Sequence, residues 1–268
     1  SGTSAVTGLL AQAGLDAPSD LMPPTEANPK GYWESVGIMQ INDRLLKDID
    51  SDWASLDRLP RDWMTTNQAR EWRSSLLLCI REIFSGSQHP IIKDPRFCVL
   101  IEGLRPWFES SLIQPVFLIP IRQPLEVALS IQKSENLDLS HGLQLWLSHV
   151  LRSEHASRGN PRLVIDFQRL IDRPADVLKQ CRDFLEANEI TTGRQQSDQQ
   201  LIGFIDPSLR RQRASNSRSD SSRRGEHYAA WLELAEQVYN VLSDSASSEA
   251  AWGPQLEPLR QRWLKLST

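Results

Sequence analysis

The chain has 268 residues, of which 40% are hydrophobic and 24% charged, and its formal net charge at pH 7 is −4. These values predict one large domain with a sizeable core that spans residues 1–268. The mild acidic excess argues against a nucleic-acid partner, and no apolar run approaches the ~20 residues that span a bilayer. Cys79, Cys98 and Cys181 are scattered among apolar residues. This pattern indicates buried thiols, and we expect a cytoplasmic protein without a metal site.

The chain begins with small and hydroxyl-bearing residues that lead into a helix. Ser1, Gly2, Thr3 and Ser4 come first, and apolar residues at helical spacing follow until Gly14, which suits a helix C-terminus. Such a turn binds anions, because its backbone N–H groups and the helix dipole both favour a phosphate or sulfate. The same residues are also ordinary helix caps, so this turn alone leaves both interpretations open.

A long proline-rich connection over residues 15–31 brings Trp33 and Glu34 to the start of a helix expected over Ser35–Ile49. Long connections in compact domains tend to be functional. Glu34 has two interpretations from the pattern alone. It is either an acid at the helix N-terminus that the dipole stabilises, or a general base that removes a proton from a substrate.

The loop over residues 50–66 contains Trp53 and Trp63. Tryptophan rings either stack on a sugar or aromatic acceptor or pack into the core, and the sequence does not decide between these roles. A helix with one apolar face is expected next, over Asn67–Phe84.

A short strand is expected over His89–Lys93, with Asp94 and Arg96 just after its carboxyl end. Lys93 at this position suits the stabilisation of negative charge in a transition state. Asp94 would orient Lys93 or the acceptor, or act as the base in place of Glu34. The structural alternative is a surface turn in which Asp94 pairs with Arg96.

A second buried strand is expected from Pro115 to Arg122, and Pro124 suits the first position of the helix that follows. Arg122 therefore lies at the carboxyl end of a strand, with Ser130 about two turns into the next helix. Ligands of open α/β sheets bind at that edge, where the planar fork of Arg122 and the Ser130 hydroxyl can hold a phosphate.

Further elements alternate between helix and strand. A helix is expected over Ser140–Ser157, a strand over Arg162–Phe167 and a helix over residues 175–187, which predicts an α/β fold with a mainly parallel sheet. We expect His141, His149 and His155 to be solvated or helix-terminal side chains rather than ligands.

The composition then changes over residues 206–225, which are rich in arginine and serine. This segment is expected to be either mobile and solvated or a lid whose arginines, with Arg210 or Arg211 first, close over an anion. Two helices, over residues 226–242 and 255–266, are expected to complete the chain.

These motifs, in this order, resemble those of the PAPS-dependent sulfotransferases. Their 5′-phosphosulfate loop reads basic-Ser-Gly-Thr-Ser/Thr, which residues 1–4 match from its second position. Their 3′-phosphate motif is a strand, an Arg and a Ser eight residues later, which Arg122 and Ser130 match. The segments over residues 28–34, 93–96 and 163–174 look like those of the bacterial branch, so the resemblance extends over about the first two thirds of the chain.

The resemblance implies a P-loop-NTPase-like three-layer fold, with a mainly parallel central sheet flanked by helices and a first strand upstream of residue 1. It also implies transfer of a sulfuryl group from PAPS to a hydroxyl or amine acceptor, with PAP as the product and no metal. The acceptor would be a small molecule or a glycan. The oligomeric state is not predicted. The cofactor would bind Ser1, Gly2, Thr3, Ser4, Arg122 and Ser130. Family members also bring a basic C-terminal segment to the 3′-phosphate, and the arginine-rich composition, without a matching motif, suggests Arg210 or Arg211 for that contact.

The catalytic residues implied are Glu34, Lys93 and Asp94, and the acceptor would contact Trp33, Trp53 and Arg96. Cytosolic members use a His two positions after the Lys as the base. That position is Pro95 here, which favours a carboxylate base, either Glu34 or Asp94. Two alternative functions remain. A P-loop kinase or NTPase would need a Gly-Lys-Ser/Thr loop, which residues 1–4 lack, and a non-catalytic anion- or glycan-binding module would keep the same fold.

Overall fold

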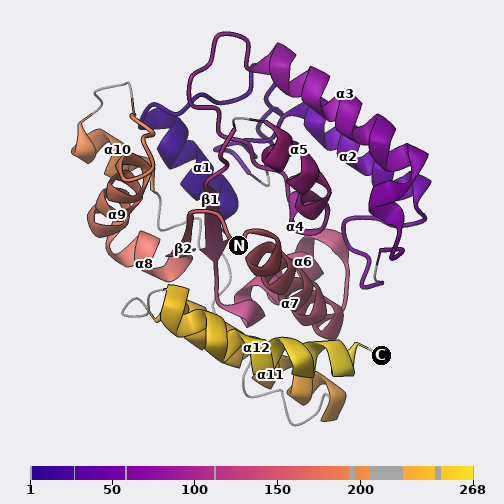
Figure 1. Cartoon of the computed structure of the whole chain (residues 1–268). Coiled ribbons are helices and arrows are strands. Elements are labelled where there is room, and N and C mark those ends of the chain that lie inside the picture. The colour runs from indigo at the N-terminus through magenta and orange to yellow at the C-terminus, as the bar shows by residue number, and fades with distance from the viewer. Residues whose placement is uncertain are drawn as a thin grey trace.

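The computed structural model describes residues 2–26, 28–57, 59–111, 113–192, 197–205, 226–244 and 249–267. Its fold is mixed α/β and mostly helical, and a small parallel sheet lies between groups of helices (Figure 1). Before the sheet come α1 (Thr3–Gln12), α2 (Val36–Asp48), η1 (Trp63–Thr65), α3 (Asn67–Ile83), α4 (Phe97–Leu100), η2 (Ile101–Leu104) and α5 (Arg105–Ser110). The helices expected before residue 85 are confirmed.

The sheet within the described residues consists of β1 (Phe117–Ile121) and β2 (Arg162–Asp166), paired in parallel with Ile121 opposite Asp166. Helices α6 (Pro124–Glu135) and α7 (Leu139–Ala156) connect the two strands. The strands predicted to end at Arg122 and Phe167 and the helix that begins at Pro124 are confirmed. The sheet described is small, and the larger P-loop-like architecture stays a prediction.

The prediction of a strand over His89–Lys93 is wrong. This segment makes an isolated bridge to Asp16, whose N–H donates to the His89 carbonyl (3.0 Å) and whose own carbonyl accepts from the Ile91 N–H (2.9 Å). Pro18 has no N–H to donate the next bond of this parallel pairing, to the Ile91 carbonyl, which limits the pairing to this one point. Lys93 therefore belongs to a loop that leads into α4.

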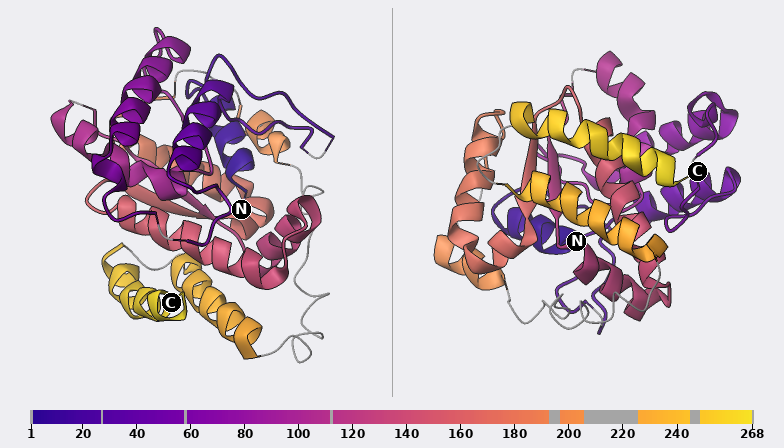
Figure 2. Two further views of the ribbon diagram at one scale, coloured as in Figure 1. Left: turned by 90° about the vertical axis from the view of Figure 1, so that its right-hand side faces the viewer. Right: turned by 90° about the horizontal axis from the view of Figure 1, so that it is seen from below.

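Helices pack on both faces of the sheet because the strand side chains alternate. Ile119 and Ile121 face a core formed with α6, α7 and the two C-terminal helices. Leu118 and Ile165 face the other way, into a core that includes α1. After β2 come α8 (Phe167–Asp172), α9 (Pro174–Glu186), α10 (Asp198–Phe204), α11 (Glu226–Ser243) and α12 (Glu249–Leu266). Helices α11 and α12 pack together along one side of the molecule (Figure 2).

A third core lies between α2, α3 and the short helices near residue 100. Trp63 is 6% exposed there, and its ring meets that of Trp72 edge-on at 6.0 Å between centroids. Trp63 is therefore a core residue, which decides between the two roles that the sequence left open for it.

A buried carboxylate, Glu154 on α7, joins α7 to β2 and α12. Its oxygens accept hydrogen bonds from Arg158 (2.9 and 3.0 Å), from Arg162 at the start of β2 (3.2 Å) and from Arg260 on α12. The Glu154 side chain is 1% exposed. These charge-assisted bonds satisfy a group that would be costly to bury alone.

Candidate functional site

The N-terminus of α1 is formed by Gly2, whose φ of 85° places it in the left-handed region. The Gly2 carbonyl accepts the first helical hydrogen bond from Val6 N–H (3.1 Å), and Gly2 offers no side chain to cap the helix. The first N–H groups of a helix have no partner within it, so they are available to an anion. Ser4 Oγ donates to the Tyr32 carbonyl (3.2 Å), which ties this turn to the segment before Glu34. Ser1 lies outside the described residues.

The aromatic ring of Phe167 contacts both this turn and Arg122. A Cβ placed on Gly2 would come within 2.2 Å of Phe167 Cδ2, so the glycine permits this close approach. The Arg122 guanidinium lies over the same ring, 4.9 Å from its centroid. The structure therefore brings the two motifs together through the first residue after β2. We call these three residues, together with Glu126 on α6, which binds the Arg122 side chain, the Arg122 cluster.

Further contacts fix the orientation of Arg122 at the end of β1. Its Nε donates to Glu126 Oε2 (2.9 Å), and its carbonyl accepts from Trp146 Nε1 (3.0 Å). The side chains of Arg122 and Glu126 are 11% and 2% exposed. Ser130 lies exposed on α6, about one turn beyond Glu126. The strand-end position predicted for Arg122 is confirmed, while Glu126 was not anticipated.

A second polar cluster contains all three residues predicted to be catalytic. Glu34, 6% exposed, directly precedes Ser35, which caps α2 by accepting from Ile38 N–H (3.0 Å). The Lys93 ammonium donates to Glu34 Oε1. Arg96 Nη1 lies 4.0 Å from Glu34 Oε2, so the carboxylate faces two cations.

Arg96 is itself bound by two other carboxylates. Its Nε and Nη2 donate to the two oxygens of Asp43, the latter at 2.9 Å, and its Nη1 donates to Asp94 Oδ1 (3.0 Å). Burial opposes the charge of Arg96, but the bonds to Asp43 and Asp94 outweigh burial and raise its pKa. The predicted pairing of Asp94 with Arg96 is present. It lies in a buried network rather than in a surface turn.

Asn42 completes this network from the core side. Its Nδ2 donates to Asp94 Oδ2 (3.2 Å), and its Oδ1 accepts from Trp72 Nε1 (2.8 Å). We call Glu34, Asn42, Asp43, Lys93, Asp94 and Arg96 the Glu34 cluster. The sequence analysis missed Asn42 and Asp43. A signal was present, because Asn42 interrupts the apolar spacing of Ile38 and Leu45 and is 0% exposed.

The two tryptophans predicted to contact an acceptor lie in different surroundings. Trp33 packs against Gly8 of α1 and meets the Phe204 ring of α10 edge-on at 6.2 Å. Trp53 lies in a loop held against α7, where its carbonyl contacts His149 Nε2 (3.2 Å) and the next carbonyl, of Ala54, contacts His141 Nε2 (2.8 Å). The prediction of solvated histidines is wrong for His149, and burial lowers its pKa to about 4.

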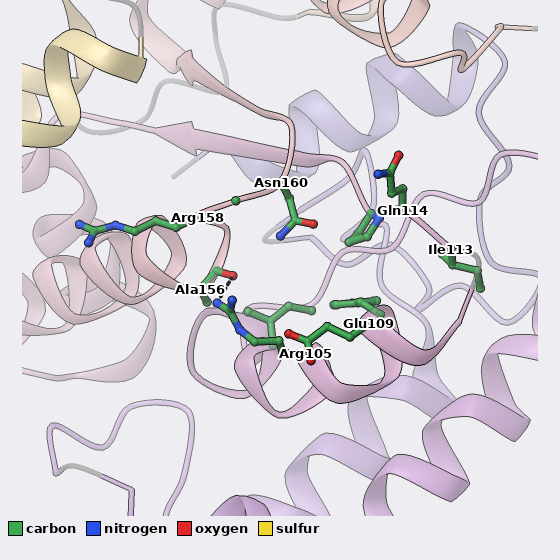
Figure 3. A pocket seen from close by; sticks show the side chains of 11 residues that line it. Arg105, Glu109, Ile113, Gln114, Ala156, Arg158 and Asn160 are labelled. Carbon is green, nitrogen blue, oxygen red and sulfur yellow. Dashed lines mark hydrogen bonds between the residues drawn. The ribbon is translucent and has the colours of Figure 1, made fainter.

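A cavity of about 200 Å³ lies at the opposite edge of the sheet (Figure 3). It is bordered by the residues that lead into β1 and β2, with Arg105 donating to the Ala156 carbonyl (3.5 Å) at one wall. No predicted site residue lines it. Among the described residues, no three His, Cys, Asp or Glu side chains are placed so that they could hold a metal ion, and none of the helices described combines the length and hydropathy of a membrane span. The predicted contacts of Arg210 and Arg211 lie outside the described residues.

Comparisons with protein-family models, with curated proteins and with solved structures yield no significant match.

Proposed function

We propose that the chain is a PAPS-dependent sulfotransferase with a P-loop-like three-layer fold. The observation that supports this most strongly is the Arg122 cluster. A helix N-terminus that begins at a glycine and an arginine at a strand end both lie against one aromatic ring, that of Phe167. A donor with two separated anionic groups would use both features, and PAPS has a 5′-phosphosulfate and a 3′-phosphate.

In this proposal the backbone N–H groups at the start of α1 bind the phosphosulfate with the hydroxyls of Ser1 and Thr3, and with that of Ser4 once it turns from the Tyr32 carbonyl to the anion. Arg122 and Ser130 bind the 3′-phosphate, to which Arg210 and Arg211 add positive charge. Glu126 holds the guanidinium by Nε (2.9 Å), which orients the fork before the cofactor arrives.

The Glu34 cluster supplies the chemistry. An acceptor oxygen or nitrogen attacks the sulfur atom and forms the new bond, while its proton passes to the Glu34 carboxylate. The bond from sulfur to the phosphate oxygen breaks, and its electron pair leaves with PAP. Lys93 stabilises charge on the transferring group, so catalysis is mostly positioning and electrostatics. The acceptor, a small molecule or a glycan, would lie near Trp33 and Trp53.

Calorimetric titration with PAP tests the proposal, with the Arg122→Ala variant beside the native chain. We expect saturable binding that weakens at least about 30-fold in Arg122→Ala, because charge-assisted bonds to a phosphate contribute roughly 2 kcal/mol or more. Arg105→Ala, at the other edge of the sheet, is the matched control and should bind normally. No binding of PAP by the folded native chain, with binding of ATP and Mg²⁺ instead, would replace the proposal by a kinase or NTPase. PAP binding without any turnover of PAPS would favour a binding module.

A further inference from the structure

We infer that Arg96 is a positioning residue for Glu34, the base of the proposed step. The inference rests on the proposed function and deepens it. The sequence pattern placed Arg96 among the acceptor-binding residues and left the base undecided. The contacts of the Glu34 cluster separate these roles.

Asp94 is enclosed by its partners. Its Oδ1 accepts from the Arg96 backbone N–H (2.9 Å) and from Arg96 Nη1 (3.0 Å), and its Oδ2 accepts from Asn42 (3.2 Å). Its side chain is 1% exposed. Both oxygens therefore already accept hydrogen bonds, and the side chain is less exposed than that of Glu34, which makes Asp94 the less accessible of the two carboxylates.

Glu34 is arranged differently. Lys93 occupies Oε1, while Oε2 lies 4.0 Å from Arg96 Nη1, beyond hydrogen-bonding distance. Within the described part of the chain, Oε2 has no hydrogen-bond donor against it, and its side chain is 8% exposed. Oε2 is therefore the atom that takes the acceptor proton.

Arg96 is held from two sides. The half-exposed Asp43, at 46%, binds Nε and Nη2 in a bidentate manner from α2. From the core side, Trp72 orients Asn42, Asn42 orients Asp94, and Asp94 binds Nη1. A guanidinium clamped in this way presents a fixed positive charge to Glu34 Oε2. A lysine could not bridge the same carboxylates, because it lacks the planar fork.

The positioning role acts within a balanced step. The acceptor O–H proton moves to Glu34 Oε2 as the oxygen forms its bond to sulfur and PAP departs with the electron pair of the broken bond. Arg96 exchanges no proton and bonds to neither substrate. Its loss should slow the step without weakening cofactor binding.

The test measures release of PAP from PAPS with water as the acceptor, which needs no knowledge of the natural acceptor. The variants are Arg96→Ala, Arg96→Lys and Asp43→Asn. Arg158→Ala, which removes an arginine–carboxylate pair remote from the site, is the control for structural damage. Initial rates give kcat and the KM for PAPS, and each rate is recorded from pH 5 to pH 9.

We expect Arg96→Ala to lower kcat by about 30- to 100-fold, with KM changed less than about threefold, because misplacement of a catalytic group by about 1 Å has effects of this size. Arg96→Lys should recover little, and Asp43→Asn should lose about fivefold because the exposed half of the clamp is weakened. The dependence of kcat on pH should change on the acidic side in Arg96→Ala, whereas Arg158→Ala should keep the pH dependence of the native chain. If Arg96→Ala does not fold, the kcat of Asp43→Asn tests the inference instead, because this variant weakens the same clamp on Arg96.

Three results would overturn the inference. A kcat of Arg96→Ala equal to that of Arg158→Ala would show that Arg96 has a structural role alone. A raised KM with an unchanged kcat in Arg96→Ala would show that Arg96 binds substrate and does not position the base. Binding of PAP by a native chain that releases none from PAPS would remove the step that Arg96 positions, whereas absence of PAP binding would remove the proposed function itself.

Discussion

The Arg122 guanidinium and the Gly2 backbone lie against the same aromatic ring, that of Phe167. The ring is held there because Phe167 is the first residue after β2 and begins α8, where Asp166 accepts from Gln168 N–H (3.0 Å). A cation over a buried ring gains about 1–2 kcal/mol. One side chain thus sets the distance between the two predicted halves of the cofactor site.

We expect Phe167→Leu to weaken PAP binding about 5- to 30-fold, because the flat support under Arg122 is lost with little loss of apolar volume. Titration calorimetry measures this directly. Phe184→Leu makes the same change on α9, in the same core but away from Arg122, and should leave the affinity unchanged. Equal affinities for both variants would show that the ring does not orient the arginine.

Gly2→Ala should destabilise the fold and weaken PAP binding. The substitution places a Cβ 2.2 Å from Phe167 Cδ2 at a residue with a φ of +85°. Gly86→Ala imposes the same backbone strain, at a φ of +81°, where nothing lies within 4 Å of the new Cβ. Strain alone costs about 1 kcal/mol, and we expect Gly2→Ala to cost a further 1–3 kcal/mol from the clash. Urea unfolding compares the two, and equal losses would contradict the close approach.

The sequence predicted the elements whose signals are local. A clear apolar pattern marks β1, β2, the helix from Pro124 and the amphipathic helices. Arg122 and Glu34 were singled out because each lies at the end of such an element. The strand prediction for residues 89–93 was wrong because their apolar residues resemble a strand, whereas the partner segment has a proline, Pro18, where the next N–H donor is needed. An apolar run does not reveal which backbone groups will find a partner.

The site was predicted in its parts but not in its connections. Lys93 and Glu34 were assigned separate roles, and the ion pair between them depends on how the loop after Pro90 packs against α2. Phe167 was expected at the end of a strand, and its place beneath Arg122 follows from tertiary packing. Contacts between residues distant in the chain leave no periodic signal in the sequence. The ion pair and the ring contact could therefore be identified only from the structure.

His149 should make the folded chain less stable as the pH falls below about 6.5. Burial lowers its pKa to about 4, whereas the unfolded chain has the ordinary value of 6.5. Between these pH values the unfolded state binds a proton that the folded state does not, so the free energy of unfolding falls by up to about 1.4 kcal/mol per pH unit and levels off below pH 4.

The His149→Gln variant keeps an N–H donor for the Trp53 carbonyl and removes the titration. Urea unfolding between pH 4 and pH 7.5 should therefore show a shallower slope for His149→Gln than for the native chain. Parallel slopes would mean that the ring titrates normally and that the loop carrying Trp53 does not bury it.

Glu154 should be the strongest single electrostatic contributor to the attachment of α12. Burial alone would raise the pKa of this carboxyl, but the hydrogen bonds and charges of Arg158 and Arg260 outweigh burial and lower it below 4.5. A carboxyl with a lowered folded pKa stabilises the fold above its unfolded pKa, and this contribution is lost as the pH falls through the folded value. The native chain should therefore lose stability progressively below about pH 4.5.

Glu154→Gln removes the charge and leaves the buried guanidinium of Arg260 with a neutral amide in its place. We expect a loss of about 3–5 kcal/mol at pH 7, the usual cost of breaking a buried pair, and a flatter acid dependence below pH 4.5. Glu233→Gln is the matched control, because Glu233 pairs with Arg262 on the exposed surface, where solvent screens the charges, and its removal should change little. A Glu154→Gln variant as stable as Glu233→Gln would show that apolar packing alone holds α12 against α7.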